Sequence, residues 1–178
     1  MTKMPPAAPA QPRKIIVSSD HLASGEGWEL SEVEFGLTVL NNAFQKWIVR
    51  CAVAAGQPEL SATDVLVLHH VNHRHSEKKR VDICFMLNIE DAHNVTYALK
   101  RLIGLDLIAG TKRGKEIYYS TTAKGQELCE KYRQIRADCL LSLVGSVENY
   151  EADFPHVAER LRVLSGLYEQ ASRAAASL

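Results

Sequence analysis

The sequence has 178 residues, 46% hydrophobic and 24% charged, which is the composition of about one globular domain with its own core. Its 21 basic and 21 acidic residues give a net charge of zero, which argues against indiscriminate binding of polyanions, so any nucleic-acid site must depend on a local patch. No run of about 18 apolar residues occurs, which excludes a membrane-spanning helix and favours a cytoplasmic protein.

The N-terminal third predicts a tail followed by one long helix. Residues 1–14 are rich in Pro and Ala and lack the continuous apolar segment of a signal peptide, so they are predicted to be a disordered tail. Residues 15–58 are predicted to form an N-terminal extension and a dimerisation helix. Ser31 and Glu34 fit a capping box that opens this helix, and Gly56 with Pro58 ends it. Its apolar stripe consists of Val33, Leu37, Leu40, Phe44, Trp47, Ile48 and Cys51.

Three shorter helices are predicted next. The first opens at Ser61, with Asp64 three residues later, and a short one covers residues 81–87. The last begins near Asp91, ends at Gly104, and turns Val95, Ala98, Leu99 and Leu102 inward. Its outward face carries His93, Asn94, Thr96, Tyr97, Lys100 and Arg101.

A β-hairpin and two long helices complete the chain. The hairpin joins residues 107–112 to 115–120 through a two-residue turn predicted at Arg113-Gly114. That turn would place Ile108 opposite Tyr119 and Gly110 opposite Ile117. Lys112, Arg113 and Lys115 would lie at the tip. The two helices are predicted over about residues 123–148 and from about residue 153 onward.

The order of these elements is typical of a winged helix-turn-helix. The predicted fold is mainly α with a small β-hairpin, with residues 59–122 as the DNA-binding lobe and residues 123–178 as C-terminal dimerisation helices. The apolar stripes of the flanking helices exceed what so small a lobe can cover. This surplus predicts a homodimer.

Four stretches resemble the MarR family of bacterial transcription regulators, in the right order over about residues 31–175. They are Leu60-Ser61 before an apolar helix, Asn94-Val95-Thr96-Tyr97 through Leu99-Lys100-Arg101-Leu102 in a recognition helix, Gly104-Leu105-Asp106-Leu107-Ile108 before the wing, and Thr121-Thr122-Ala123-Lys124-Gly125 after it. The last is similar to the family's L-T-x-x-G motif. The resemblance implies a homodimer whose recognition helices and wings straddle a palindromic operator, with repression as the expected mode.

Three features depart from the family pattern: the wing, the residue at position 97, and the stretch 69–80, which is unusual for the family. The usual wing is longer and carries an Asp-x-Arg pair that braces its base, whereas this turn is short and the pair is absent. Tyr97 stands where the family often has an arginine. Ligands of this fold usually lie between the dimer helices and the lobe. No residue here marks such a pocket, so any small-molecule effector stays unidentified.

Residue chemistry supports a DNA-binding surface. Residues 93–124 contain six basic and two acidic side chains, whereas residues 126–178 contain six and eight. A helix in the major groove reads bases from its N-terminal outer face, here His93, Asn94, Thr96 and Tyr97. Lys100 and Arg101, one turn later, suit phosphates. At the hairpin tip, Arg113 suits a minor groove, and Lys112 and Lys115 suit flanking phosphates.

Other functions remain as alternatives. His69 and His73, four residues apart, or His70 and His73, could chelate a divalent metal within residues 69–75, with Cys84 or His93 as guesses for a third ligand. A basic helix end beside residues 78–80 explains the same residues without a metal. A winged-helix dimer that binds protein in place of DNA is a further alternative. No enzyme motif occurs, and no cofactor is expected. The four cysteines form no C-x-x-C pair and are expected to be buried free thiols.

Overall fold

The computed structural model describes residues 20–23, 27–146 and 153–178. The chain divides into two compact units, residues 1–48 and 49–178. The predicted tail, residues 1–14, lies outside the described residues. None of the helices in the described ranges is long and apolar enough to cross a membrane.

The first unit contains α1 (Asp20–Ala23) and most of α2 (Trp28–Ala54). The long helix was predicted correctly, but its start was not. Gly27, with a φ of +88°, precedes the helix, and its carbonyl accepts a hydrogen bond from the Leu30 amide. Ser31 therefore lies inside α2, where its buried hydroxyl donates to the Leu22 carbonyl at 2.6 Å. The predicted capping box with Glu34 is wrong because the hydroxyl bonds to α1.

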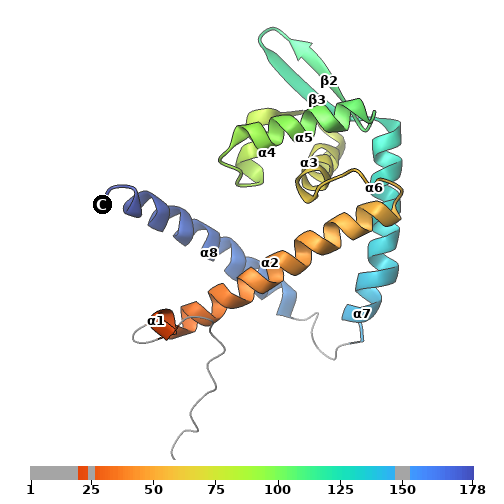
Figure 1. Ribbon diagram of the computed structural model, residues 1–178. Helices are drawn as coiled ribbons and strands as arrows, with labels where there is room; N and C mark the ends of the chain where they lie inside the picture. The colour runs from red at the N-terminus through yellow and green to blue at the C-terminus, as the bar shows by residue number, and fades with distance from the viewer. Residues whose placement is uncertain (1–19, 24–26, 147–152) are drawn as a thin grey trace, which may run out of the picture. The chain divides into compact units, whose positions relative to one another are not determined.

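The second unit is centred on a helical lobe with a small sheet (Figure 1). Its elements are α3 (Ala62–Asn72), the short turn η1 (His73–His75), β1 (Lys78–Lys79), α4 (Arg80–Met86), α5 (Ala92–Gly104), β2 (Ile108–Arg113) and β3 (Glu116–Thr121). The predicted mainly α fold with a small hairpin is confirmed. Its core includes Leu68, Ile83, Leu99 and Leu107, each 2% exposed or less.

Local sequence signals set the helix starts of the lobe as predicted. Ser61 caps α3 in a reciprocal capping box: its backbone amide donates to Asp64 Oδ2 at 2.8 Å, and its hydroxyl oxygen accepts from the Asp64 amide at 3.3 Å. Asp91 caps α5 by accepting a hydrogen bond from the His93 amide at 2.9 Å. Asp106 follows α5 with a φ of +58°, a left-handed residue that ends the helix.

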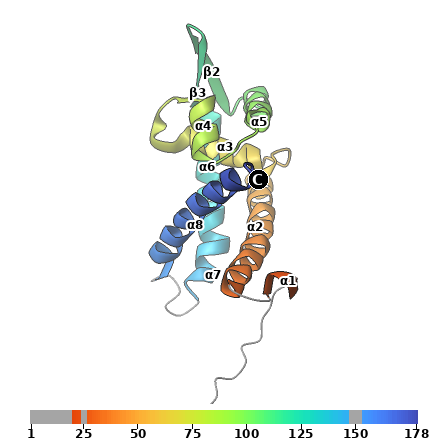
Figure 2. The same ribbon diagram turned by 90° about the vertical axis from the view of Figure 1, so that its left-hand side faces the viewer.

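The hairpin register differs from the predicted one by two residues. Arg113 pairs with Glu116, Gly110 with Tyr119 and Ile108 with Thr121, so the turn residues are Gly114 and Lys115. Gly114 takes a φ of +61°, as the first central residue of a type II′ turn requires. A shift of two residues keeps every side chain on its predicted face. The hairpin projects beyond α3, α4 and α5 (Figure 2).

A third strand was missed in the sequence. β1 pairs with β3, Lys78 opposite Tyr119 and Lys79 opposite Tyr118, which gives a sheet of order β1-β3-β2. With only two residues, β1 is too short to show the alternation of apolar and polar side chains by which a strand is recognised in a sequence. It ties the connection between α3 and α4 to the wing.

The C-terminal part of the second unit contains α6 (Ala123–Arg136), the π-helical turn η2 (Ala137–Leu141), α7 (Ser142–Val144) and α8 (Phe154–Ala175). The predicted helix over residues 123–148 is thus continued by a π turn, and its last residues lie outside the described ranges. Of the four free cysteines, Cys51 is buried, Cys84 and Cys129 are half-buried and Cys139 is exposed, so the expectation of buried thiols holds only for Cys51 and is wrong for Cys139.

Candidate nucleic-acid interface

Helix α5 presents one polar edge to solvent. Val95, Ala98, Leu99 and Leu102 are buried as predicted, because they recur every three or four residues on the side that faces α3 and α4. The opposite side leaves His93, Asn94, Tyr97 and Lys100 exposed, with Tyr97 65% exposed. Thr96 is half-buried at the border between the two sides.

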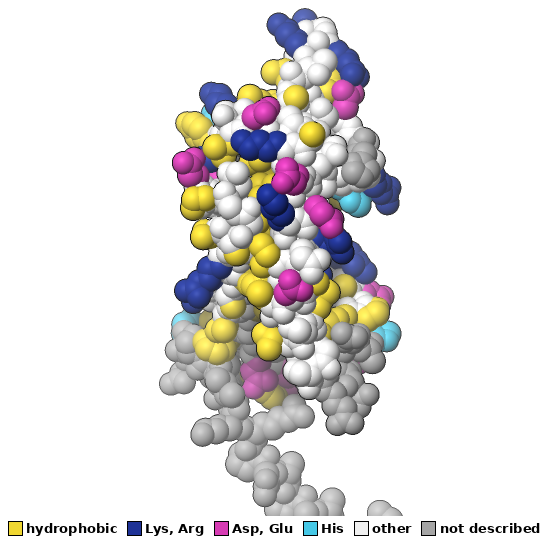
Figure 3. All heavy atoms as spheres, turned by 90° about the vertical axis from the view of Figure 1, so that its right-hand side faces the viewer, with side chains coloured by type: hydrophobic (Ala, Val, Ile, Leu, Met, Phe, Trp, Pro, Cys, Tyr) yellow, Lys and Arg dark blue, Asp and Glu magenta, His cyan; other side chains and the backbone are white. Residues whose placement is uncertain are grey.

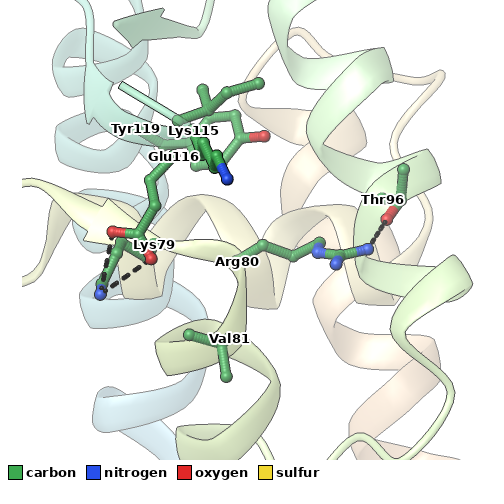
Figure 4. A pocket seen from close by; sticks show the side chains of 8 residues that line it. Lys79, Arg80, Val81, Thr96, Lys115, Glu116 and Tyr119 are labelled. Atoms are coloured by element: carbon green, nitrogen blue, oxygen red, sulfur yellow. Dashed lines mark hydrogen bonds and ion pairs between the residues drawn. The ribbon is translucent and has the colours of Figure 1, made fainter. Parts of the chain in front are cut away.

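The predicted helix edge and the predicted wing open onto one hollow. This hollow of about 420 Å³, here called the wing notch, lies between α4, α5 and the hairpin (Figure 4). Its lining residues are Lys79, Arg80, Val81, Thr96, Lys115, Glu116, Ile117 and Tyr119. Thr96 of α5 and Lys115 of the hairpin turn therefore share one side of the lobe.

The wing tip is basic. Basic side chains gather at the end of the hairpin (Figure 3). Lys112 and Lys115 are exposed, and neither makes an ion pair or side-chain hydrogen bond within residues 20–23, 27–146 and 153–178. Both ammonium groups are therefore available to an anion.

Arg113 is held in place by a neighbour that the sequence did not reveal. Its guanidinium makes a two-pronged contact with Glu77, with Nη1–Oε2 at 2.7 Å and Nη2–Oε1 at 2.8 Å. The same group lies 5.1 Å from the ring centroid of Tyr118. Arg113 is thus oriented before any ligand arrives, and a DNA contact by this residue would compete with Glu77.

Comparisons with known proteins match this geometry. Residues 60–125 match the family model described as a winged helix DNA-binding domain. A MarR transcriptional regulator from Methanosarcina mazei Go1 has a similar structure, with a TM-score of 0.63 at 14% identity over 84% of this chain and 97% of that one. The fold is that of the MarR-family transcriptional regulators.

Two further solved structures show the same likeness. A MarR-family regulator from Rhodococcus sp. RHA1 gives a TM-score of 0.63 at 11% identity, covering 79% of this chain and 96% of that one. A mutant MarR from E. coli, solved in complex with operator DNA, gives 0.55 at 16% identity, covering 71% and 93%. No curated protein matches the chain. The resemblance predicted from the sequence is confirmed for the MarR fold.

The wing of this MarR fold has its own brace. Lys79 Nζ lies 3.1 Å from Glu116 Oε2, and Glu77 holds Arg113, so two ion pairs tie residues 77–79 to the hairpin. Hydrogen bonding to Glu116 raises the pKa of Lys79 above its usual 10.5. In the sequence, these two ion pairs are indicated only by the positions of Glu77 and Glu116, each of which lies next to several basic residues.

Arg101 has a structural partner. Its Nη1 lies 3.1 Å from Oδ2 of Asp64, a carboxylate 4% exposed, and donates to the Glu59 carbonyl at 3.3 Å. Arg101 therefore neutralises a buried charge at the start of α3. Its predicted phosphate contact stays a prediction, and this ion pair gives the residue a second role.

The histidine segment does not assemble a metal site in the described part of the chain, where no group of three or more His, Cys, Asp or Glu side chains could hold an ion. His69 packs edge-to-face on Tyr132, with ring centroids 4.5 Å apart. His73 is exposed one turn later. Burial lowers the pKa of His69 below its usual 6.5.

The lowered pKa of His69 predicts acid-sensitive stability. The unfolded chain binds the proton at a higher pH than the folded chain, so the free energy of unfolding falls as the pH drops below about 6.5. In His69→Phe, which keeps a ring against Tyr132, this fall should be shallower. Urea titrations at pH 7.5, 6 and 5 measure it, with His93→Phe as the exposed control. Identical pH profiles for His69→Phe and the wild type would contradict the prediction.

Proposed function

We propose that this chain is a MarR-family transcriptional regulator that binds a palindromic DNA operator as a homodimer, in the cytoplasm, and acts as a repressor. The observation that carries the proposal is the wing notch: Thr96, at the border of the exposed edge of α5, and Lys115 of the hairpin turn line the same hollow. A helix and a wing on one side of a lobe can enter neighbouring grooves of one duplex.

The charge distribution supports DNA as the ligand. Lys100 on α5 and Lys112 and Lys115 on the wing are exposed, in a chain whose net charge is zero. We assign phosphate contacts to these three lysines and base contacts to the N-terminal part of α5. There, Asn94 suits adenine and His93 and Tyr97 flank it. Arg113 enters the minor groove after leaving Glu77.

The flanking helices support the dimer, each by its own surface. In α2, exposed apolar side chains recur at alternating spacings of three and four, the pattern of a helix that packs lengthwise on another helix: Leu30, Val33, Leu37, Leu40 and Phe44. In α8, a 22-residue helix, no described residue is buried. We assign both surfaces to a second copy of the chain.

Selection of random duplex DNA tests the function. The wild-type protein should enrich a palindrome with half-sites about one helical turn apart. The double variant Lys112→Ala/Lys115→Ala should bind the enriched duplex more weakly and lower the slope of log affinity against log salt by about two. The matched control is Lys131→Ala/Arg133→Ala on α6. Equal salt slopes for the two double variants would mean that the lysines of the wing do not contact DNA.

One observation favours a second candidate, a winged-helix dimer that binds protein. On α4, Val81 and Met86 are each 63% exposed and Phe85 is 82% exposed, more apolar surface than a DNA contact explains. If selection from random DNA enriches no sequence, this candidate replaces the first.

A further inference from the structure

The wing notch contains basic residues beyond those predicted for the wing from the sequence. Lys79, Arg80 and Lys115 line it, against one acidic side chain, Glu116. Glu116 is paired with Lys79 at 3.1 Å. Arg80 and Lys115 therefore supply a net positive charge of about two that no carboxylate in the notch offsets.

Arg80 is held in a defined direction. Its side chain extends from the start of α4 toward α5 (Figure 4), where Nη1 donates to Thr96 Oγ1 at 3.1 Å. The Thr96 hydroxyl in turn donates its only proton to the Ala92 carbonyl at 2.8 Å. The hydroxyl oxygen is thus fixed as an acceptor for the guanidinium. One of the five guanidinium N–H groups is used, and Arg80 itself is exposed.

We propose that the wing notch binds a backbone phosphate of the DNA duplex through Arg80 and Lys115, and that Thr96 is a positioning residue for Arg80 in place of a base reader. The inference rests on the proposed function. If α5 lies in the major groove and the wing in the adjacent minor groove, the strand that separates those grooves passes between them. The wing notch is the hollow at that place.

The chemistry of the notch suits a phosphodiester. A guanidinium binds two oxygens of one phosphate side by side, and an ammonium adds a second charge without fixed geometry. Lys79 neutralises Glu116, which would otherwise repel the phosphate. Thr96 is better suited to this positioning role than to base reading, because its proton already binds Ala92 and its oxygen already binds Arg80.

Charge removal tests the phosphate contact. Arg80→Ala should weaken binding of the selected duplex about tenfold, the value of one charge-assisted hydrogen bond, and lower the salt slope by about one. Arg80→Lys should keep the slope and lose part of the affinity. Arg133→Ala, an exposed arginine on α6, is the control for charge alone. If Arg80→Ala keeps wild-type affinity and slope while the wild type binds the duplex, the inference is wrong and the proposed function stands.

A double-mutant cycle tests the role of Thr96. Thr96→Val removes the acceptor and should weaken binding severalfold, and Thr96→Ser, which keeps the hydroxyl, should restore most of that loss. In the Arg80→Ala background, Thr96→Val should cost no further affinity. A full additional loss in that background would mean that Thr96 contacts DNA independently, which overturns the positioning role.

Replacing single phosphates of the duplex with uncharged groups shows which backbone phosphate is contacted, and competition with free phosphate shows whether the contact depends on the duplex. Single methylphosphonate substitutions along the duplex should reveal one phosphate per half-site whose neutralisation weakens the wild type but not Arg80→Ala. Inorganic phosphate at constant ionic strength should compete only weakly, since it lacks the other contacts of the duplex. If a methylphosphonate at every position weakens binding of the wild type, and weakens binding of Arg80→Ala equally, the proposal of one discrete phosphate site is contradicted.

Discussion

Gly125→Ala should lower the free energy of unfolding by about 3 kcal/mol, because the position has no room for a methyl group. A Cβ built on Gly125 would lie 2.0 Å from the Leu107 carbonyl oxygen and 2.7 Å from Thr121 Cγ2. The Leu107 side chain is fully buried, and its carbonyl accepts a hydrogen bond from the Thr122 amide at 3.1 Å. Relief of the clash would therefore separate the start of α6 from the strand entry at Leu107.

Thermal unfolding measures the effect. A loss of this size in a chain of this length should lower the melting temperature by roughly 6–12 °C. Gly104→Ala is the matched control, since nothing lies within 4 Å of a Cβ built there and Gly104 is in α5. That variant should stay within about 0.5 kcal/mol of the wild type. A Gly125→Ala protein that melts with the Gly104→Ala control would show that α6 does not approach Leu107 so closely.

This packing gives a physical reason for the stretch at residues 121–125, which resembles the family motif. Thr122 caps α6, with its hydroxyl oxygen accepting from the Gly125 amide at 3.1 Å and its hydroxyl donating to the Asp106 carbonyl at 2.7 Å. The cap fixes the helix start against the end of α5, and Gly125 lets the two segments touch. The cap is local, because Thr122 and Gly125 lie three positions apart, and this part of the motif can be recognised in the sequence; its contacts with Asp106 and Leu107 join distant positions and cannot.

The helices of the lobe could be predicted wherever the helical spacing of apolar residues or a capping residue marked them. Val95, Ala98, Leu99 and Leu102 were assigned inward from helical spacing alone, and Ser61 with Asp64 marked the start of α3. The hairpin was also predicted, but its register was not. Arg113-Gly114 and Gly114-Lys115 are both plausible two-residue turns, each with Gly114 at a position that can take a positive φ, and only the strand pairing of Arg113 with Glu116 separates them.

The charged contacts of the candidate site were beyond prediction because they join distant positions. Glu77 and Arg113 are 36 residues apart, Lys79 and Glu116 are 37 apart, and Arg80 and Thr96 are 16 apart. No periodicity connects such pairs, and the strand that brings them together has two residues. The sequence could name the basic residues of the surface, but which of them are engaged by a carboxylate depends on tertiary structure.

If the protein binds DNA as a dimer, the variant Leu161→Asp should show the largest loss of DNA affinity. Apolar side chains of α8 fall on one stripe at spacings of three and four residues: Phe154, Val157, Leu161, Leu164 and Tyr168. Leu161 lies at the centre of this stripe and is 42% exposed in the single chain. An aspartate there costs little in a monomer, but in a dimer interface it would bury an unpaired carboxylate.

Leu161→Asp should therefore sediment as a monomer at concentrations where the wild type is a dimer, with an unchanged helical content. Loss of the second half-site contact should weaken binding of the palindrome by about a hundredfold or more, whereas binding to a single half-site should change little. Gln170→Asp adds the same charge on the opposite face of α8 and should remain a dimer. A dimeric Leu161→Asp protein with wild-type affinity would mean that α8 does not form the interface, and α2 alone would then have to supply it. A monomer that keeps full affinity for the palindrome would instead contradict the proposal that two copies bind together, since one lobe cannot occupy both half-sites.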